Sequence, residues 1–168
     1  GDLVGYGADP EYAITKAKTL FKFTLKGNHD FAVSENDTKN FYYQSQYAVE
    51  WTRLKLKPYL TIYNYFDYLA SLPYTHTIGT HFFSHGSYIE PEKFHYIENH
   101  TDAQKNLIKN NNINNIVFIG HTHVPLIYTL SEVIYPVAPD KEYIFSEPVI
   151  INVGSVGQPR DKINQACY

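Results

Sequence analysis

The first half of the chain is dominated by apolar residues at helical spacing. Residues 9–11 combine a capping aspartate, a proline at the first helical position and an acidic residue in the first turn. These three features together predict the start of a helix. Ile14, Ala17 and Phe21 follow as its apolar stripe, so we expect an amphipathic helix that begins near Pro10.

Two further helices are predicted, over residues 41–57 and 58–72, each with an inward apolar face. The residues expected on those faces are Tyr47, Trp51, Leu54, Ile62, Phe66 and Leu69. Because they recur at helical spacing, we interpret these aromatic residues and most neighbouring tyrosines as core packing. The alternative is a platform on which nucleic-acid bases stack.

Strands are predicted wherever a short run is apolar or alternates between apolar and polar residues. The runs cover residues 21–25, 74–78, 80–84, 116–119, 126–130, 143–145 and 148–153. Residues 116–119 are apolar without a break, so this strand is expected to be buried on both faces. A capping box of Thr101 and Gln104 predicts another helix, which ends at Asn110. Helices that alternate with buried strands indicate an α/β fold with mixed sheets.

The composition narrows the class of protein. The chain has 168 residues, of which 43% are hydrophobic, and this suits one domain over residues 1–168. The net charge is −3 without a basic stripe, so binding to nucleic acid is not expected. No apolar run approaches the ~20 residues of a membrane span, and one cysteine excludes an intrachain disulfide. We expect a cytoplasmic protein that binds no membrane, and its oligomeric state is left open.

Polar residues of a similar kind gather at the ends of the predicted strands. The segments are Gly1-Asp2, Gly27-Asn28-His29-Asp30, His85-Gly86-Ser87 and Gly120-His121-Thr122-His123. In α/β folds, ligands bind beyond the carboxyl ends of the strands, so these side chains are expected to meet. Imidazole, amide and carboxylate groups without a thiolate suit Mn²⁺, Fe, Zn²⁺, Ni²⁺ or Co²⁺. So many candidate ligands fit two metal ions ~3.5–4 Å apart better than one.

His29 and Arg160 have candidate roles other than metal binding. Asp30 follows His29 and can fix its tautomer and keep it protonated. A cationic histidine beside a bound phosphate is placed to protonate the leaving oxygen, and support of the metal ligands is the alternative role. Arg160 could bind a substrate phosphate through two hydrogen bonds, or it could pair with Asp161 or Glu147.

In their order along the chain, these segments resemble four of the five sequence blocks of the calcineurin-like metallophosphoesterases. The resemblance covers nearly the whole chain. It implies two packed mixed β-sheets flanked by helices, in four layers α/β/β/α. It also implies two divalent metal ions, with manganese favoured. The implied activity is hydrolysis of a small phosphorylated substrate, a phosphodiester or phosphomonoester, by direct attack of a metal-bound hydroxide.

The resemblance also assigns a role to each residue of the site. The metal ligands that it implies are Asp2, Asn28, His85, His121 and His123. Asp2 would bridge the two ions, and His123 would reach the second ion while the other three ligands hold the first. His29 would be the acid that protonates the leaving group, paired with Asp30.

Two features depart from the family pattern. The first block of the family, an Asp-x-His that supplies two ligands to the second ion, is absent, and the chain contains no methionine. We therefore expect a domain truncated at the N-terminus, with its first strands missing, and truncated at the C-terminus as well. Residues 1–7 also lack the phosphate-binding arginine of the phosphoprotein phosphatases. Residues 5–10, Trp51-Thr52 and residues 152–161 resemble instead a bacterial branch closer to small phosphodiesterases.

Three hypotheses for the function remain at this point. The first is a metal-dependent hydrolase of phosphoesters. The second is a diadenosine-polyphosphate hydrolase or a protein phosphatase, which the missing arginine disfavours. The third is a non-catalytic, metal-dependent binding module. The pair His29-Asp30 counts against the third hypothesis, because a scaffold has no need of a leaving-group acid.

Overall fold

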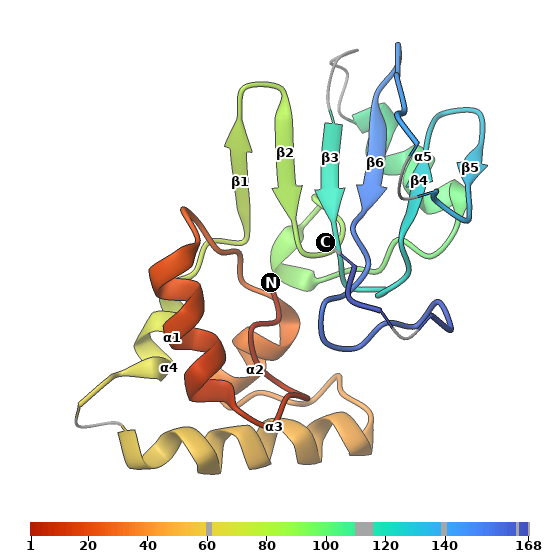
Figure 1. Ribbon diagram of the computed structural model, residues 1–168. Helices are drawn as coiled ribbons and strands as arrows, with labels where there is room; N and C mark the ends of the chain where they lie inside the picture. The colour runs from red at the N-terminus through yellow and green to blue at the C-terminus, as the bar shows by residue number, and fades with distance from the viewer. Residues whose placement is uncertain (60–61, 110–115, 139–140, 164, 168) are drawn as a thin grey trace. The chain divides into compact units, whose positions relative to one another are not determined.

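The computed structural model describes residues 1–59, 62–109, 116–138, 141–163 and 165–167. They form two compact units, Gly1–Tyr74 and Thr75–Tyr168, and each is described by itself (Figure 1). The organisation of residues 1–168 as one domain stays a prediction. Among the described helices, the longest has 14 residues, and none has the length and apolar character that a membrane crossing requires.

The N-terminal unit is helical. Its helices are α1 (Pro10–Leu20), α2 (Asn28–Glu35), α3 (Tyr43–Leu56), the 3₁₀ turn η1 (Lys57–Tyr59) and α4 (Tyr65–Ser71). Its core consists of buried apolar side chains, namely Val4, Ile14, Ala32, Val33, Val49, Leu56, Tyr65, Leu69 and Leu72. Helices as short as α2 and α4 are marginal alone in water, so this shared core holds them in place.

The start of the first helix is predicted correctly. α1 begins at Pro10, and Ile14 and Ala17 are buried as expected. Phe21 lies beyond the end of the helix in extended backbone and is 59% exposed, so the predicted stripe is one residue too long.

The predicted buried face of α3 is wrong. Tyr47 and Leu54 are 65% and 62% exposed, whereas Val49, Thr52 and Leu56 are buried. The Thr52 hydroxyl donates a hydrogen bond to the carbonyl one turn earlier at 2.8 Å, so its burial leaves this group satisfied. The predicted face and the observed face both follow helical spacing. The face that packs into the core is the observed one, which has the smaller side chains. The interpretation of Tyr47 as a packing residue is therefore wrong as well.

Two other predicted elements of this unit differ from those observed. The described residues 21–25 form no strand, although they alternate as a strand would. Alternating apolar and polar residues favour a strand. A strand also requires a neighbouring strand that supplies its backbone hydrogen-bond partners. The helix predicted over residues 58–72 is divided into η1 and α4. Ile62, expected inward, is 71% exposed, whereas Leu69 is fully buried.

The C-terminal unit is built on a mixed β-sheet. In spatial order its strands are β1 (Thr75–Ile78), β2 (His81–Ser84), β3 (Ile116–Ile119), β6 (Val149–Asn152), β4 (Leu126–Tyr128) and β5 (Val133–Ile134). β3 pairs in parallel with β2 and β6, and the other pairs are antiparallel. The α/β class and the mixed sheet are therefore confirmed. The described residues contain this one six-stranded sheet, and the expected second sheet is not seen among them.

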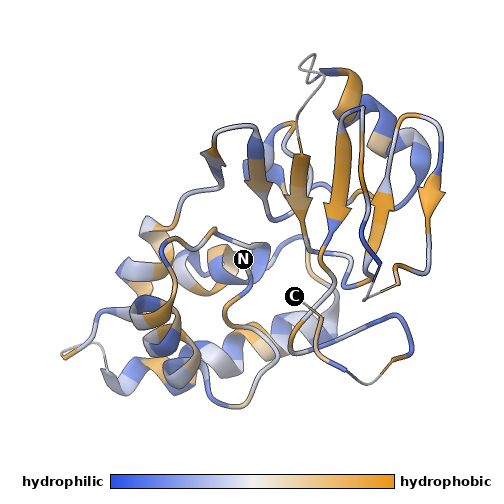
Figure 2. Cartoon of the chain, turned by 45° about the horizontal axis from the view of Figure 1, so that its top comes forward, coloured by the Kyte–Doolittle hydropathy of each residue, from blue (hydrophilic) through white to orange (hydrophobic). Residues whose placement is uncertain are grey.

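The strands β3 and β6 lie at the centre of the sheet, and hydrophobic residues follow both of them (Figure 2). Val117 and Ile119 are buried, while Ile116 and Phe118 are half-buried, so β3 is more completely covered on one face than on the other. The core of this unit gathers residues from the sheet, from α5 (His100–Lys109) and from the loop before it. They are Ile97, Ala103, Leu107, Val117, Ile119, Tyr128 and Ile150.

The predicted cap of α5 is wrong. Asn99 caps the helix instead of Thr101, because its Oδ1 accepts a hydrogen bond from the Asp102 amide at 3.0 Å. Gln104 donates to the carbonyl of Leu130 at 2.8 Å. The predicted end of this helix at Asn110 lies outside the described residues.

The predicted strand at residues 143–145 is not observed among the described residues. β4 pairs with β5 and β6 instead. The Tyr143 hydroxyl accepts a hydrogen bond from the Ala138 amide at 3.0 Å, and its ring stacks on that of Phe145 with centroids 6.2 Å apart. These local contacts hold the segment in another conformation.

Candidate metal centre

In the N-terminal unit, the predicted site residues gather at the start of α2. Asn28 is the first residue of this helix, and Asp2 Oδ1 accepts a hydrogen bond from the His29 amide at 2.9 Å. Asp2 has a φ of 54°, in the left-handed region that non-glycine residues adopt at a cost of ~1–3 kcal/mol. A Cβ at Gly27 would collide with Asp2 Oδ1 and the Asp2 amide, so this close approach requires glycine.

Asp30 links the start of the chain to α2. Its carboxylate is fully buried and accepts three backbone hydrogen bonds. Oδ1 accepts from Leu3 at 2.8 Å and Val4 at 3.3 Å, and Oδ2 accepts from Gly27 at 3.0 Å. Asp30 therefore anchors the loop that carries Asp2, a role that the sequence did not indicate. Its predicted pairing with His29 stays a prediction.

The His29 ring is confined by aromatic neighbours. It is 6% exposed, and its centroid lies 4.5 Å from that of Tyr6 and 5.0 Å from that of Phe41. Gly5 presses against the same ring, since a Cβ there would collide with His29 Nδ1, and its φ of 127° also favours glycine. The three neighbours fix the orientation of this imidazole.

The substitution Gly27→Ala is expected to destabilise the N-terminal unit by about 1–3 kcal/mol, because the added Cβ collides with the backbone of Asp2. Urea unfolding followed by the fluorescence of Trp51, the one tryptophan, measures this loss. Gly7→Ala is the matched control, because a Cβ at Gly7 meets nothing within 4 Å. Equal unfolding midpoints for the two variants would contradict the packing described for Gly27.

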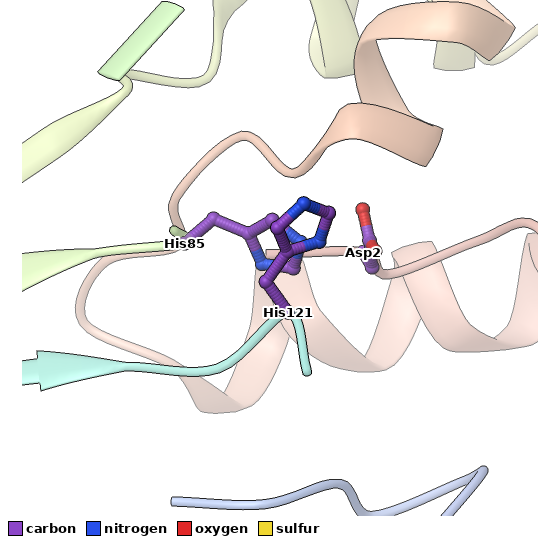
Figure 3. Close-up of side chains that lie close together, drawn as sticks. All are labelled: Asp2, His85 and His121. Atoms are coloured by element: carbon purple, nitrogen blue, oxygen red, sulfur yellow. The ribbon is translucent and has the colours of Figure 1, made fainter. Parts of the chain in front are cut away.

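In the C-terminal unit, His85 and His121 follow β2 and β3, which are parallel neighbours. Both side chains are buried, at 6% and 5% exposure, and their ring centroids lie 4.6 Å apart. Figure 3 draws them together with Asp2 of the N-terminal unit. Each of the three side chains offers one ligand atom, a carboxylate oxygen or an imidazole nitrogen.

The environment of His121 suits a metal ligand. Its Nε2 lies 2.9 Å from the carbonyl oxygen of Phe94, so Nε2 carries the hydrogen and Nδ1 carries the lone pair that a metal requires. The backbone of His121 has a φ of 64°, and such strain is concentrated at functional sites. Two adjacent buried imidazoles of this kind fit a divalent cation well.

Tyr96 is a part of the site that the sequence did not indicate. Its ring stacks on the His121 ring with centroids 3.7 Å apart and planes 9° apart. The loop from Gly86 brings it there, because the Ser87 amide bonds the carbonyl of His95 at 2.9 Å. No residue spacing signals this contact, since it depends on the path of the loop.

Tyr96→Ala is expected to weaken the binding of Mn²⁺ by about 2- to 12-fold, the effect of losing one aromatic pair. The stacked Tyr96 ring holds the imidazole of His121 in place. Without it the imidazole is free to move, and fixing it when Mn²⁺ binds costs entropy. Tyr96→Phe keeps the ring and should bind Mn²⁺ within about twofold of the wild type. Calorimetric titration of Mn²⁺ compares the wild type with the two variants. An equal loss of Mn²⁺ affinity in Tyr96→Ala and Tyr96→Phe would show that stacking does not support metal binding.

His123 and Arg160 belong to one local arrangement. His123 Nδ1 lies 2.7 Å from the carbonyl of Gln158, and its φ is 62°. The Arg160 amide donates to the carbonyl of His123 at 3.1 Å. The guanidinium of Arg160 is exposed and donates to Gln158 Oε1 at 2.9 Å. Its predicted contact with substrate phosphate stays a prediction.

Two hydroxyl groups that follow His85 closely in the sequence are poorly suited to a catalytic role. Ser87 Oγ donates at 2.7 Å to Asn106 Oδ1 and bonds the backbone of Ile89, so it holds the loop together. Burial raises the pKa of the Tyr88 hydroxyl to about 12, so this group stays protonated near neutral pH. Neither group is placed as a nucleophile or a base.

Buried histidines at the ends of parallel strands give this α/β fold a candidate metal site. The chain matches the calcineurin-like phosphoesterase family over residues 1–146 and belongs to that family. It is 30% identical over 179 residues to the uncharacterized protein MJ0912 of Methanocaldococcus jannaschii, with 100% of this chain and 67% of that protein covered. The crystal structure of a metallophosphoesterase from Sphaerobacter thermophilus matches with a TM-score of 0.80 and 32% identity, over 99% of this chain and 68% of that one.

Proposed function

We propose that the protein hydrolyses a phosphoester, a phosphodiester or a phosphomonoester, with the help of two divalent metal ions. The observation that carries this proposal is the buried pair of His85 and His121, in a chain of the calcineurin-like phosphoesterase family. Nitrogen and oxygen donors without a thiolate suit Mn²⁺, Fe, Zn²⁺, Ni²⁺ or Co²⁺, and manganese is the first choice among them because of the resemblance to the family.

The proposed metal ligands are Asp2, Asn28, His85, His121 and His123. When bound, the ions supply the Lewis acidity that activates water and neutralises the phosphoryl oxygens. The protein itself holds the ligand side chains in position for the ions. The carbonyl oxygens of Phe94 and Gln158 orient the rings of His121 and His123. Asp30 anchors the loop that carries Asp2.

His29 is the proposed proton donor to the leaving oxygen. Its ring is held by Tyr6 and Phe41, so little motion is needed at the moment of transfer. Because Gly5 lies against Nδ1, we assign the transferred proton to Nε2. As the bond between phosphorus and the leaving oxygen breaks, this proton passes to that oxygen and the imidazole becomes neutral.

A panel of substrates tests the proposal. Model phosphomonoesters, phosphodiesters and dinucleoside polyphosphates are assayed with the metal-free protein after addition of Mn²⁺, Zn²⁺, Ni²⁺ or Co²⁺. We expect hydrolysis of at least one class, dependent on added metal. Metal binding without turnover of any member would favour a binding module instead. Activity confined to dinucleoside polyphosphates would favour a hydrolase of that class.

A further inference from the structure

Asn152 lies at the end of β6, level with the start of the loop that carries His121 and His123. β6 and β3 are parallel neighbours, and their register pairs Asn152 with Ile119, the last residue of β3 (Figure 1). Asn152 is buried, with 2% of its surface exposed. Burial of a carboxamide is costly unless its hydrogen bonds are made, so its partners show which part of the structure it stabilises.

The turn at His121 is strained. The Thr122 amide donates to the carbonyl of Gly120 at 2.7 Å, and this bond closes a three-residue γ-turn around His121. The φ of His121 is 64°, and a γ-turn with a positive φ at its centre is rare and strained. Such a backbone persists only where the surrounding structure holds it. The direction in which the imidazole leaves the loop therefore depends on the groups that hold this turn.

Asn152 holds both ends of the turn. Its Nδ2 donates to the carbonyl oxygen of Gly120 at 2.8 Å and to Thr122 Oγ1 at 2.7 Å. Its Oδ1 accepts from the Gly154 amide at 3.0 Å. This pattern fixes the orientation of the carboxamide, because a backbone amide must meet its oxygen and a backbone carbonyl its nitrogen. The carboxamide has two donor hydrogens, and both are used on the residues that flank His121.

The same turn connects the two buried histidines. The Gly120 amide donates to the carbonyl of His85 at 2.9 Å, so the residue that Asn152 holds also contacts the backbone of His85. The ring centroids of His85 and His121 lie 4.6 Å apart. A shift of Gly120 would therefore change the separation of the two imidazoles, on which a shared metal ion depends.

We propose that Asn152 is a positioning residue of the candidate metal centre, an inference that rests on the metal site of the proposed function. Asn152 acts on the backbone turn from which the imidazole of His121 projects. The carbonyl of Phe94 and the ring of Tyr96 act on the imidazole itself. A ligand that is held in its binding geometry before the ion arrives loses less entropy on binding, so loss of Asn152 lowers the affinity for the metal.

Calorimetric titration of Mn²⁺ into the metal-free wild type and into two variants tests this role. Asn152→Ala removes both donors and is expected to weaken Mn²⁺ binding by about 10- to 100-fold, the usual effect of losing an outer partner of a ligand. Thr122→Val keeps the shape of the side chain and removes the hydroxyl that Nδ2 contacts. It is expected to weaken binding by about 2- to 12-fold, the effect of one hydrogen bond, and it decides the question if Asn152→Ala does not fold.

Thr129→Val is the matched control for a loss of stability alone. Thr129 is 3% exposed in the same unit, and its Oγ1 accepts hydrogen bonds from the amides of Ser131 at 3.2 Å and Glu132 at 3.1 Å. These bonds lie in the turn between β4 and β5. Urea unfolding should show a loss of stability in this variant, while its affinity for Mn²⁺ stays within about twofold of the wild type.

Wild-type affinity for Mn²⁺ in folded Asn152→Ala or in Thr122→Val would overturn the proposal. An equal loss of affinity in Thr129→Val would overturn it as well, because the loss would then follow stability alone. Assays of phosphoester hydrolysis on the same samples separate this proposal from the proposed function. Weaker Mn²⁺ binding in the Asn152 and Thr122 variants, without hydrolysis of any ester by the wild type, supports the positioning role and contradicts the hydrolase. A wild type that binds no Mn²⁺ overturns the metal site and the positioning role with it.

Discussion

Replacement of His29 by alanine is expected to slow the hydrolysis of an alkyl phosphodiester by about 10²–10⁴-fold, the usual contribution of a general acid. A p-nitrophenyl phosphodiester should lose far less, because its leaving group departs without a proton. The metal content should stay at the wild-type level, since His29 is not among the proposed ligands. Steady-state rates on both substrates and elemental analysis of the same samples measure these quantities.

A matched control is His81→Ala, because His81 is an exposed histidine at the start of β2 and should leave both rates near the wild type. Equal losses of rate on the two substrates in the His29 variant would remove the role of leaving-group acid. A simultaneous loss of metal would assign His29 to support of the ligands instead.

Replacement of Asp30 by alanine is expected to lower the free energy of unfolding of the N-terminal unit by about 3–9 kcal/mol. The carboxylate accepts hydrogen bonds from three backbone amides, and each amide left unpaired on burial costs about 1–3 kcal/mol. Because whole domains are stable by only about 5–15 kcal/mol, much of the unit's stability depends on this side chain. Urea unfolding followed by Trp51 fluorescence measures the loss.

Glu50→Ala is the control for the Asp30 variant. Glu50 is exposed on α3, and its removal should change the free energy of unfolding by about 0.5 kcal/mol or less. An Asp30 variant as stable as the Glu50 variant would show that the three backbone bonds contribute little.

The proximity of His85 and His121 could be predicted from the sequence because it depends on local order alone. A short apolar strand followed by a polar loop places its first loop residues at the edge of a sheet. His85 and His121 come together for this reason, since β2 and β3 are parallel neighbours. The strands β1, β2 and β6 were predictable in the same way, from runs of apolar residues and the breaks between them.

Features that depend on contacts between distant segments could not be predicted. α3 has two apolar faces at helical spacing, and only its packing on Val33 and its neighbours selects Val49 and Leu56 over Tyr47. Residues 21–25 alternate as a strand does, but pairing depends on a neighbouring strand that no local pattern supplies.

The immediate surroundings of the site were also beyond the sequence pattern. The Phe94 carbonyl and the Tyr96 ring reach His121 through the path of a loop. Asp30 serves the fold through three backbone amides, while its sequence position pointed only to its neighbour His29. In each case the partner is a backbone group or a stacked ring, and neither leaves a motif in the sequence.

We propose that His121 holds a metal ion on which hydrolysis depends. Titration of Mn²⁺ into the metal-free wild type and into His121→Ala, followed by a phosphodiesterase assay of both, tests it directly. Outer partners of metal ligands are worth about 10–100-fold in metal affinity, so loss of the ligand itself should weaken binding by at least about 100-fold and lower the rate in parallel. A His121 variant that binds Mn²⁺ and hydrolyses the ester like the wild type, or a metal-free wild type that works at full rate, would contradict this role of His121.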